Sequence, residues 1–219
     1  MAQEIEIKLR VKDAEGLRAA LKGMGARALH GGTGRVHEWN TVFDTARQDL
    51  RKREQLLRTR IETPDGQAPR RQDQAQQQPA LLTFKGPVVT RAGRRGKATI
   101  NQRHKVREEI QFRIADAASL AKILERLGMR PRFRYEKYRT TFRLPAAKRW
   151  AKGLLIELDE TPIGTFVELE GRRKAIDRAA KELGFSKKDY ILTNYLSLFA
   201  EDCRRRDKRQ GDMLFHRRK

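Results

Sequence analysis

The amino-acid sequence predicts an α+β fold, in which a closed or nearly closed antiparallel β-sheet, a β-barrel, carries a few helices. Three observations support this prediction. Segments in which polar and apolar residues alternate, the pattern of half-buried strands, recur along most of the chain. Only a few segments show the spacing of amphipathic helices. One strand-then-helix pattern occurs three times, which indicates internal pseudo-symmetry within one domain.

The strands are predicted from alternation of period two. The first covers residues 4–11, where charged and apolar side chains alternate without interruption. Further strands are predicted over residues 39–43, 56–62, 81–85, 105–114, 135–144, 154–159 and 167–170. About eight strands with few helices favour a sheet that closes on itself.

The helices of the repeated pattern have clear start and stop signals. Asp13 is the expected N-cap of the first helix and Gly25 ends it, while Asp116 and Gly128 have the same places in the second copy. The third copy begins with the strand at 167–170 and its helix ends near Gly184. A last amphipathic helix is predicted over residues 190–202.

Length and composition limit the classes of function. The 219 residues suit one domain, here residues 1–202, followed by a basic flexible tail at 203–219. Residues 63–80 and 91–104 have the composition of disordered insertions. A net charge of +22 points to polyanionic partners, and a single cysteine excludes an intrachain disulfide. The sequence shows neither a signal peptide nor a membrane span, so we expect a cytoplasmic protein without membrane contact.

One face of nearly every predicted strand carries charges of both signs. These residues are Glu4, Glu6, Lys8, Arg10, Arg58, Arg60, Glu62, Lys105, Arg107, Glu109, Lys137, Arg139, Glu157, Asp159, Glu168 and Glu170. If the apolar faces form the core, these charges are solvated outside, which is the usual fate of charge runs. If the helices cover the apolar faces instead, the charges line a hydrated interior. The apolar stripes of the helices, which need a sheet face to cover, favour the second arrangement.

The acids on this face form two Glu-x-Glu pairs, Glu4 with Glu6 and Glu168 with Glu170. Carboxylates two residues apart in a strand point the same way, so each pair can ligate one hard cation. Two such pairs that meet across a barrel would form a Mg²⁺ or Mn²⁺ site. Arginines and lysines on neighbouring strands would then hold the phosphate oxygens that the metal bridges.

The order of these motifs resembles that of the CYTH superfamily, the triphosphate tunnel metalloenzymes. This superfamily includes class IV adenylyl cyclases, thiamine triphosphatases and inorganic triphosphatases. The resemblance begins with the Glu-x-Glu-x-Lys motif at residues 4–8 and extends to about residue 200. It continues through residues 40–44, 50–53, 57–60, 82–87, 107–109, 136–139, 158–160 and 164–170.

The resemblance implies an eight-stranded antiparallel tunnel with a charged interior and helices packed outside. It implies metal ligation by Glu4, Glu6, Glu168 and Glu170, with Glu109 and Asp159 as additional ligands. It also implies that the triphosphate is gripped by Lys8, Arg58, Arg60, Lys85, Arg107, Lys137 and Arg139. Gln111 departs from the pattern, because the central strand of the family often carries another acid there. A homodimer is common among small barrels of the family.

Three functions remain open at this point. The first is a divalent-metal-dependent phosphohydrolase that acts on inorganic triphosphate, thiamine triphosphate or a nucleoside triphosphate. The second is a class IV adenylyl cyclase, which makes cyclic AMP and pyrophosphate from ATP. No His-Phe pair, a feature of some cyclases, precedes the motif at residues 4–8, and this favours the hydrolase. The third is a non-catalytic basic protein that binds nucleic acid or polyphosphate through its loops and tail.

Overall fold

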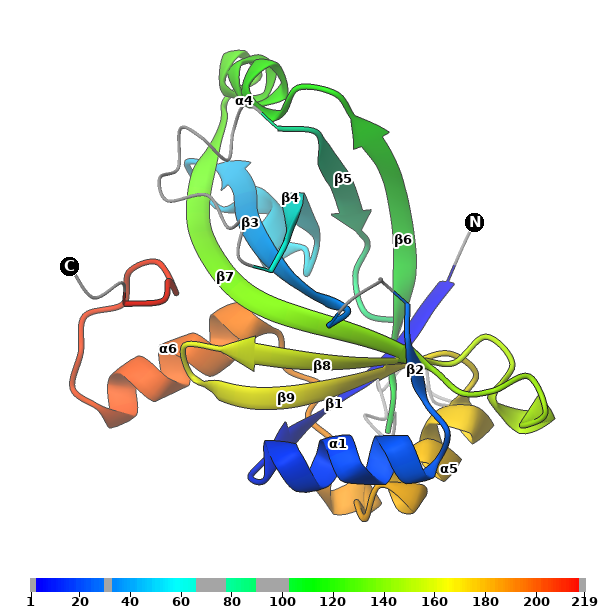
Figure 1. Cartoon of the computed structure of the whole chain (residues 1–219). Helices are drawn as coiled ribbons and strands as arrows, with labels where there is room; N and C mark the ends of the chain where they lie inside the picture. Colours follow the sequence, from blue (N-terminus) through cyan, green and yellow to red (C-terminus); the bar gives the residue numbers. More distant parts are fainter. Residues whose placement is uncertain (1–2, 30–32, 66–77, 90–102, 217–219) are drawn as a thin grey trace, which may run out of the picture.

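Eight strands close into an antiparallel barrel in the computed structural model, which describes residues 3–29, 33–65, 78–89 and 103–216 (Figure 1). The strand order around the ring is β7-β3-β4-β5-β6-β1-β9-β8, and pairing of β7 with β8 closes it. The strands are β1 (Gln3–Val11), β2 (Arg27–Ala28), β3 (Arg35–Thr45), β4 (Leu56–Pro64), β5 (Ala80–Lys85), β6 (Lys105–Ile114), β7 (Met129–Arg143), β8 (Leu155–Thr161) and β9 (Gly164–Glu170). The short β2 is an extra strand that pairs with the end of β7. The structure therefore confirms the predicted eight-stranded barrel.

The helices lie outside the barrel, as expected. They are α1 (Ala14–Gly23), α2 (Asp49–Lys52), α4 (Ala117–Arg126), α5 (Arg173–Glu182) and α6 (Tyr195–Arg205), with short 3-10 turns η1 (Arg149–Ala151) and η2 (Lys187–Asp189). Asp13 and Asp116 cap α1 and α4 with their side chains. Gly25 and Gly128 follow these helices at φ angles of +74° and +80°, in the left-handed region that favours glycine.

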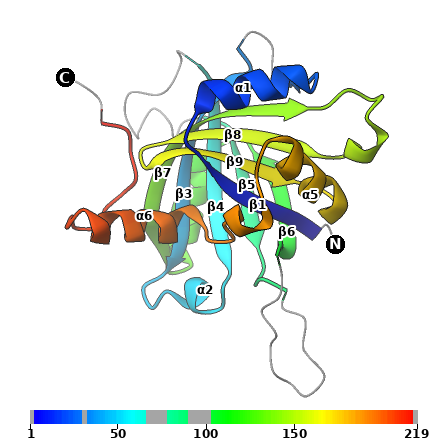
Figure 2. The same ribbon diagram turned by 90° about the horizontal axis from the view of Figure 1, so that it is seen from below.

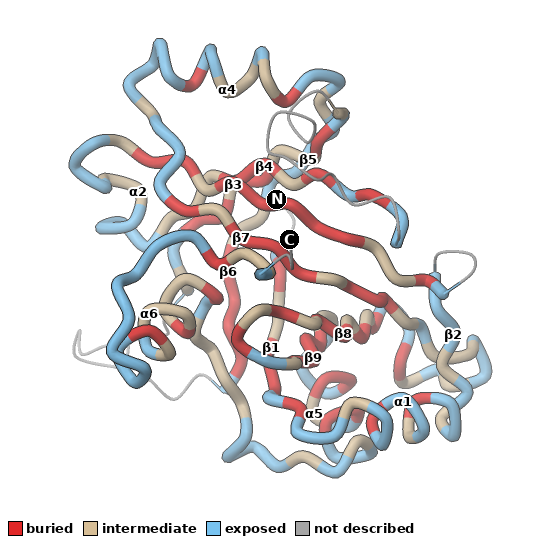
Figure 3. Tube along the Cα trace, turned by 60° about the vertical axis from the view of Figure 1, so that its left-hand side comes forward, coloured by how far each residue is buried: buried red, intermediate tan, exposed pale blue. Residues whose placement is uncertain are grey.

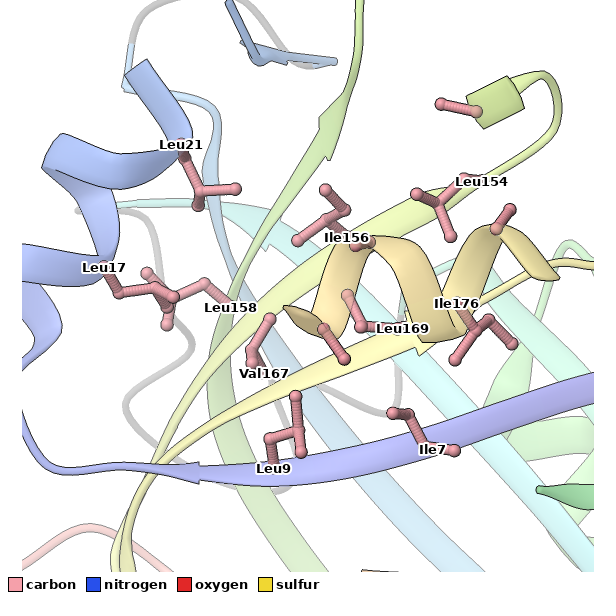
Figure 4. Packing of buried hydrophobic residues seen from close by; sticks show 14 of the residues in the cluster. Ile7, Leu9, Leu17, Leu21, Leu154, Ile156, Leu158, Val167, Leu169 and Ile176 are labelled. Atoms are coloured by element: carbon pink, nitrogen blue, oxygen red, sulfur yellow. The ribbon is translucent and has the colours of Figure 1, made fainter. Parts of the chain in front are cut away.

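The largest apolar core lies between the outer face of the barrel and two helices. Figure 4 shows Ile7 and Leu9 of β1 and Val167 of β9 pointing toward Leu17 of α1 and Ile176 of α5. Both helices lie against the strands β1, β8 and β9 (Figure 2). Burial follows the strands and leaves the outer sides of the helices exposed (Figure 3). The helices thus cover apolar strand faces, and the charged faces point inward.

Some boundaries differ from the sequence prediction. β3 and β7 are several residues longer than predicted. α6 begins at Tyr195 rather than at residue 190, because Asn194 caps it by accepting a hydrogen bond from the Ser197 amide. The extended backbone before it pairs with β1 through mutual hydrogen bonds between Ile191 and Lys8.

The segments predicted to be disordered are only partly described. Residues 66–77 and 91–102 lie outside the described residues, whereas Thr63 belongs to β4 and Ala80 begins β5. His104 is buried and lies 2.8 Å from Asp177.

The C-terminal region also differs from the flexible tail predicted from residue 203. Residues 203–205 complete α6, and Met213 is buried in an apolar cluster on the barrel. The basic composition of this region hid its apolar anchors. Among the described residues, no helix is long and apolar enough to cross a membrane.

Candidate functional site

The barrel encloses a cavity of about 980 Å³ that is lined by side chains from all eight of its strands. Strand pairing decides which charges meet there. Glu4 stands opposite Arg107 across the β1–β6 pair, and Lys8 stands opposite Glu168 across the β1–β9 pair. Because side chains alternate along each strand, whole rows of charged residues face the interior.

Twelve of the thirteen residues that the resemblance implies line this cavity. They are Glu4, Glu6, Lys8, Arg58, Arg60, Lys85, Arg107, Glu109, Lys137, Arg139, Glu168 and Glu170. Asp159 is the exception, since it is fully buried beside the cavity. Its carboxylate accepts hydrogen bonds from Lys137 (2.9 Å), from Arg139 (2.6 Å) and from the Tyr195 hydroxyl (2.7 Å). Asp159 therefore holds two of the cavity's cations in place.

Most of the cations are paired with carboxylates. Lys85 Nζ lies 2.5 Å from Glu4 Oε1, and Arg107 Nε donates to Glu4 Oε2 over 3.1 Å. Lys8 Nζ lies 2.5 Å from Glu168 Oε1, while Arg139 contacts both Glu168 and Asp159. Burial tends to raise the pKa of Glu168, but Lys8, Arg139 and nearby Lys137 hold it well below the usual value. Glu168 is therefore charged at neutral pH.

Arg58 on β4 differs from the other buried cations of the cavity. In the described part of the chain it alone among them has no carboxylate within 4 Å. Its Nη1 donates to the Tyr135 hydroxyl over 2.8 Å, while its Nε and Nη2 are buried without a hydrogen-bond partner. Buried donors without partners are costly, so Arg58 is suited to receive an anion. Although burial raises it, the pKa of Tyr135 is lowered on balance because Arg58 and neighbouring cations surround its hydroxyl.

The acidic side of the cavity lies around β9. Glu170 stands opposite Glu6 on β1, and Glu168 stands opposite Glu157 on β8. Burial and acidic neighbours, Glu157 foremost, raise the pKa of Glu170 to about 8. Burial likewise raises the pKa of Glu157 to about 7, with Glu168 adding to the effect. Like charges directly opposite each other are unfavourable, so this side of the cavity favours a bound cation.

Glu170 is the carboxylate on this side that the protein leaves unpaired. Within the described ranges it has no hydrogen bond and no ion pair from its side chain. In the same ranges, no three His, Cys, Asp or Glu side chains are gathered closely enough to form a ready-made metal cluster. The donor set of carboxylates fits a hard divalent cation, but the ligands would have to draw together around it.

Sequence reasoning missed one central residue, Glu38. It is fully buried, and its carboxylate lies 3.4 Å from Arg60, 3.3 Å from Lys137 and 3.5 Å from Arg139. The alternation of Glu38 with Trp39 and Asn40 was a usable signal, but the strand was predicted from residue 39, whereas β3 begins at Arg35. Lys105 and Glu157 were predicted to lie on the charged strand face but were assigned neither metal binding nor phosphate binding. Both residues line the cavity.

Comparison with protein families gives one match. The family model described as the CYTH domain matches residues 2–195, which is nearly the whole barrel and its helices. None of the curated proteins compared with the chain matches it in sequence.

Solved structures share the fold at low sequence identity. An adenylate cyclase candidate from Vibrio parahaemolyticus has a TM-score of 0.67 and 19% identity, with 90% of this chain and 97% of that chain covered. A protein from Pyrococcus horikoshii has a TM-score of 0.64 and 22% identity, with 91% and 99% covered. An adenylyl cyclase candidate from Hippeastrum, described as revealing a dominant triphosphatase activity, has a TM-score of 0.54 and 18% identity, with 91% and 96% covered.

Proposed function

Because the chain belongs to the CYTH domain family, we propose that it is a divalent-metal-dependent phosphohydrolase that binds a triphosphate inside the barrel. The family and its structural neighbours support an enzyme of the adenylate cyclase or triphosphatase kind. The observation that carries the proposal is the division of the cavity into two walls. In the part of the chain that the structure describes, Arg58 on β4 has no carboxylate partner and Glu170 on β9 has no cation partner. These strands lie four places apart in a ring of eight, so the two groups are on opposite sides of the cavity.

The triphosphate would lie between these walls. Arg58 offers two donor nitrogens, Nε and Nη2, that have no partner among the described residues, and Arg60, Lys85 and Lys137 lie on the same side of the ring or next to it. Several fixed cations around a linear polyanion hold it in one orientation and neutralise charge that develops as a phosphorus–oxygen bond breaks. The cations that now contact carboxylates are already positioned, so a bound phosphate would meet donors that need little reorganisation.

The residues proposed to hold the metal are Glu4, Glu6, Glu168 and Glu170, with Glu109 as a further ligand. A divalent cation there would neutralise phosphate oxygens and lower the pKa of a bound water. We assign Asp159 a different role, because its oxygens already accept hydrogen bonds from Lys137, Arg139 and Tyr195. It positions the cations that would contact the phosphates.

Cyclisation of ATP is the second candidate, and the description of the Vibrio neighbour favours it. The same cations would serve both reactions. In the cyclase, the 3′-hydroxyl of ATP would be the nucleophile and pyrophosphate would leave. In the phosphohydrolase, water is the nucleophile and phosphate is released. The identity of the products therefore distinguishes the two activities.

The test is incubation of the purified chain with Mg²⁺ or Mn²⁺ and, separately, inorganic triphosphate, thiamine triphosphate and ATP. Phosphate, pyrophosphate and cyclic AMP are quantified for the wild type, for the double variant Glu4→Gln, Glu6→Gln and for the control Glu125→Gln. Glu125 is exposed on α4, away from the cavity. Phosphate release that is lost in the double variant and kept in the control supports the phosphohydrolase. Formation of cyclic AMP and pyrophosphate from ATP would instead show that the protein is an adenylyl cyclase. If no substrate gives a product, the phosphohydrolase proposal fails and the alternative of a non-catalytic binding protein is favoured.

A further inference from the structure

The segment of residues 210–215, called here the strap, returns from α6 to the barrel (Figure 1). It docks along β7 where that strand is not paired with β8, since the β7–β8 pairing covers only Tyr138–Phe142. Met213 N donates to Arg134 O over 2.9 Å, and Glu136 N donates to Met213 O over 3.0 Å. The strap thus extends the barrel wall by one short parallel bridge.

Side chains hold the strap in place as well. Met213 is almost completely buried in a cluster with Phe133, Tyr135 and Tyr195. Leu214 packs against the cluster around Trp39 on the outer face. Asp212 accepts a hydrogen bond from the Arg134 amide over 2.8 Å. The strap is therefore held by hydrogen bonds to β7 and by apolar side chains that pack into two separate clusters. Together these contacts indicate a fixed position for the strap.

Part of the strap lines the cavity. Gln210, Gly211 and Asp212 border it, as do residues 192–194 and the first turn of α6. A Cβ atom built on Gly211 would have no atom of the described residues within 4 Å, so the space beside this residue is open with respect to them. The lining here includes Thr193, Asn194 and Gln210, which are uncharged groups that both donate and accept hydrogen bonds, together with the carboxylate of Asp212. The buried cations, in contrast, belong to the strands.

We propose that the strap forms one wall of the subsite for the group that the triphosphate carries, and thereby determines which triphosphates the barrel accepts. This inference rests on the proposed function, because it assumes that the triphosphate itself lies among the strand cations. The hydroxyl and amide groups of this lining, with the carboxylate of Asp212, can form hydrogen bonds with the base or the sugar of a nucleoside. The open space beside Gly211 is the room that such a group would occupy.

The substitution Gly211→Trp tests the inference without disturbing an anchor. Its side chain can enter the open space, and Gly211 has no positive φ angle that would strain the new residue. Gly23→Trp is the matched control, since a Cβ atom there also meets nothing within 4 Å and Gly23 ends α1 outside the cavity. Wild type and both variants are compared for hydrolysis of inorganic triphosphate and of ATP, and for the binding of each by titration calorimetry.

Gly211→Trp should reduce the preference for ATP over inorganic triphosphate by about tenfold or more, because a filled subsite rejects the larger ligand. Gly23→Trp should leave the ratio of activity on ATP to activity on inorganic triphosphate unchanged. A second variant, Met213→Asp, buries a charge in the anchoring cluster and releases the strap, so it should also lower the preference for ATP over inorganic triphosphate, because the wall that contacts the nucleoside is lost. An unchanged ratio in Gly211→Trp, with inorganic triphosphate still bound as in the wild type, overturns the inference.

The calorimetric arm separates this inference from the proposed function. If neither substrate is hydrolysed, the phosphohydrolase proposal fails, but the ratio of the two dissociation constants still decides the role of the strap. If inorganic triphosphate is hydrolysed and the preference for ATP over inorganic triphosphate is the same in Gly211→Trp as in the wild type, the strap proposal alone fails. Should Met213→Asp not fold, the Gly211→Trp result decides alone.

Discussion

Replacing Glu38 with glutamine should destabilise the protein, because it leaves three buried cations around a neutral amide. Arg60, Lys137 and Arg139 lie 3.3–3.5 Å from the carboxylate. At an effective dielectric constant of about 20, each such pair attracts by roughly 5 kcal/mol, against a desolvation penalty of several kcal/mol per ion. Lys137 and Arg139 keep Asp159 as a partner. We therefore expect a loss of about 3–5 kcal/mol in the free energy of unfolding, the range typical of broken buried pairs.

Glu62→Gln is the matched control for this experiment. Glu62 lies 3.4 Å from the same Arg60, but its side chain is 38% exposed, so its loss should cost less than about 1 kcal/mol. Urea unfolding of wild type and both variants at pH 7 measures the two costs. Equal costs for Glu38→Gln and Glu62→Gln would refute the reasoning that burial makes the Glu38 network stabilising.

The same network has a defined pH dependence. Burial tends to raise the pKa of Glu38, but Arg60, Lys137 and Arg139 hold it far below its usual range. A carboxylate with a lowered pKa in the folded state stabilises fully above its unfolded pKa of about 4.3, and this contribution is lost as the pH falls below that value. The difference between wild type and Glu38→Gln should therefore be smaller at pH 3 than at pH 7.

Three further predictions concern the cavity and the backbone. Arg58→Met should weaken binding of inorganic triphosphate roughly tenfold to a hundredfold, since charged hydrogen bonds contribute about 1.5–3 kcal/mol each. Arg58→Met should leave the free energy of unfolding of the ligand-free protein unchanged, whereas Arg107→Met should lower it, because of these two arginines only Arg107 is paired with carboxylates in the described part of the chain. Calorimetry measures the binding of inorganic triphosphate, and urea unfolding measures the stability. Mg²⁺ binding at pH 7 should release up to about one proton, because the pKa of Glu170 is raised to about 8 and a ligating carboxylate must be ionised. Calorimetry in two buffers measures this release, and an equal release from Glu170→Gln would contradict it. Gly171→Ala should cost about 1–3 kcal/mol in urea unfolding, because its φ is +149° and the new Cβ would lie 3.2 Å from backbone atoms. Gly23→Ala has open space and should cost nothing.

The rows of inward charges were predictable from local sequence. In β1, Glu4, Glu6 and Lys8 alternate with apolar residues, and a period of two puts them on one face whatever the strand pairs with. The helices supplied a second signal. Their apolar stripes have to pack against the apolar faces of the strands, and this leaves the charged faces on the inside of the barrel. Glu38 was missed because the end of a strand is weakly marked in sequence, so its place on the face went unrecognised.

The strap was missed for a compositional reason. Its anchors Met213, Leu214 and Phe215 are three apolar residues in a strongly basic region, too few to show any period. Their burial depends on the edge of β7 that β8 leaves unpaired, and the contact between Arg134 and Asp212 joins residues 78 positions apart. Asp159 illustrates the same limit, since alternation placed it on the charged face but could not show that Lys137, Arg139 and Tyr195 surround it.

The sequence by itself determined which side chains share a face, which glycines and aspartates bound the helices, and that the chain needs about eight strands. These properties follow from interactions between residues close together in the chain. The tertiary structure alone decided that, among the described residues, Arg58 has no carboxylate partner and Glu170 has no cation partner. Those facts depend on the register of strands that lie far apart in the chain, such as Glu6 opposite Glu170, because pairing with a neighbour strand sets which charges meet.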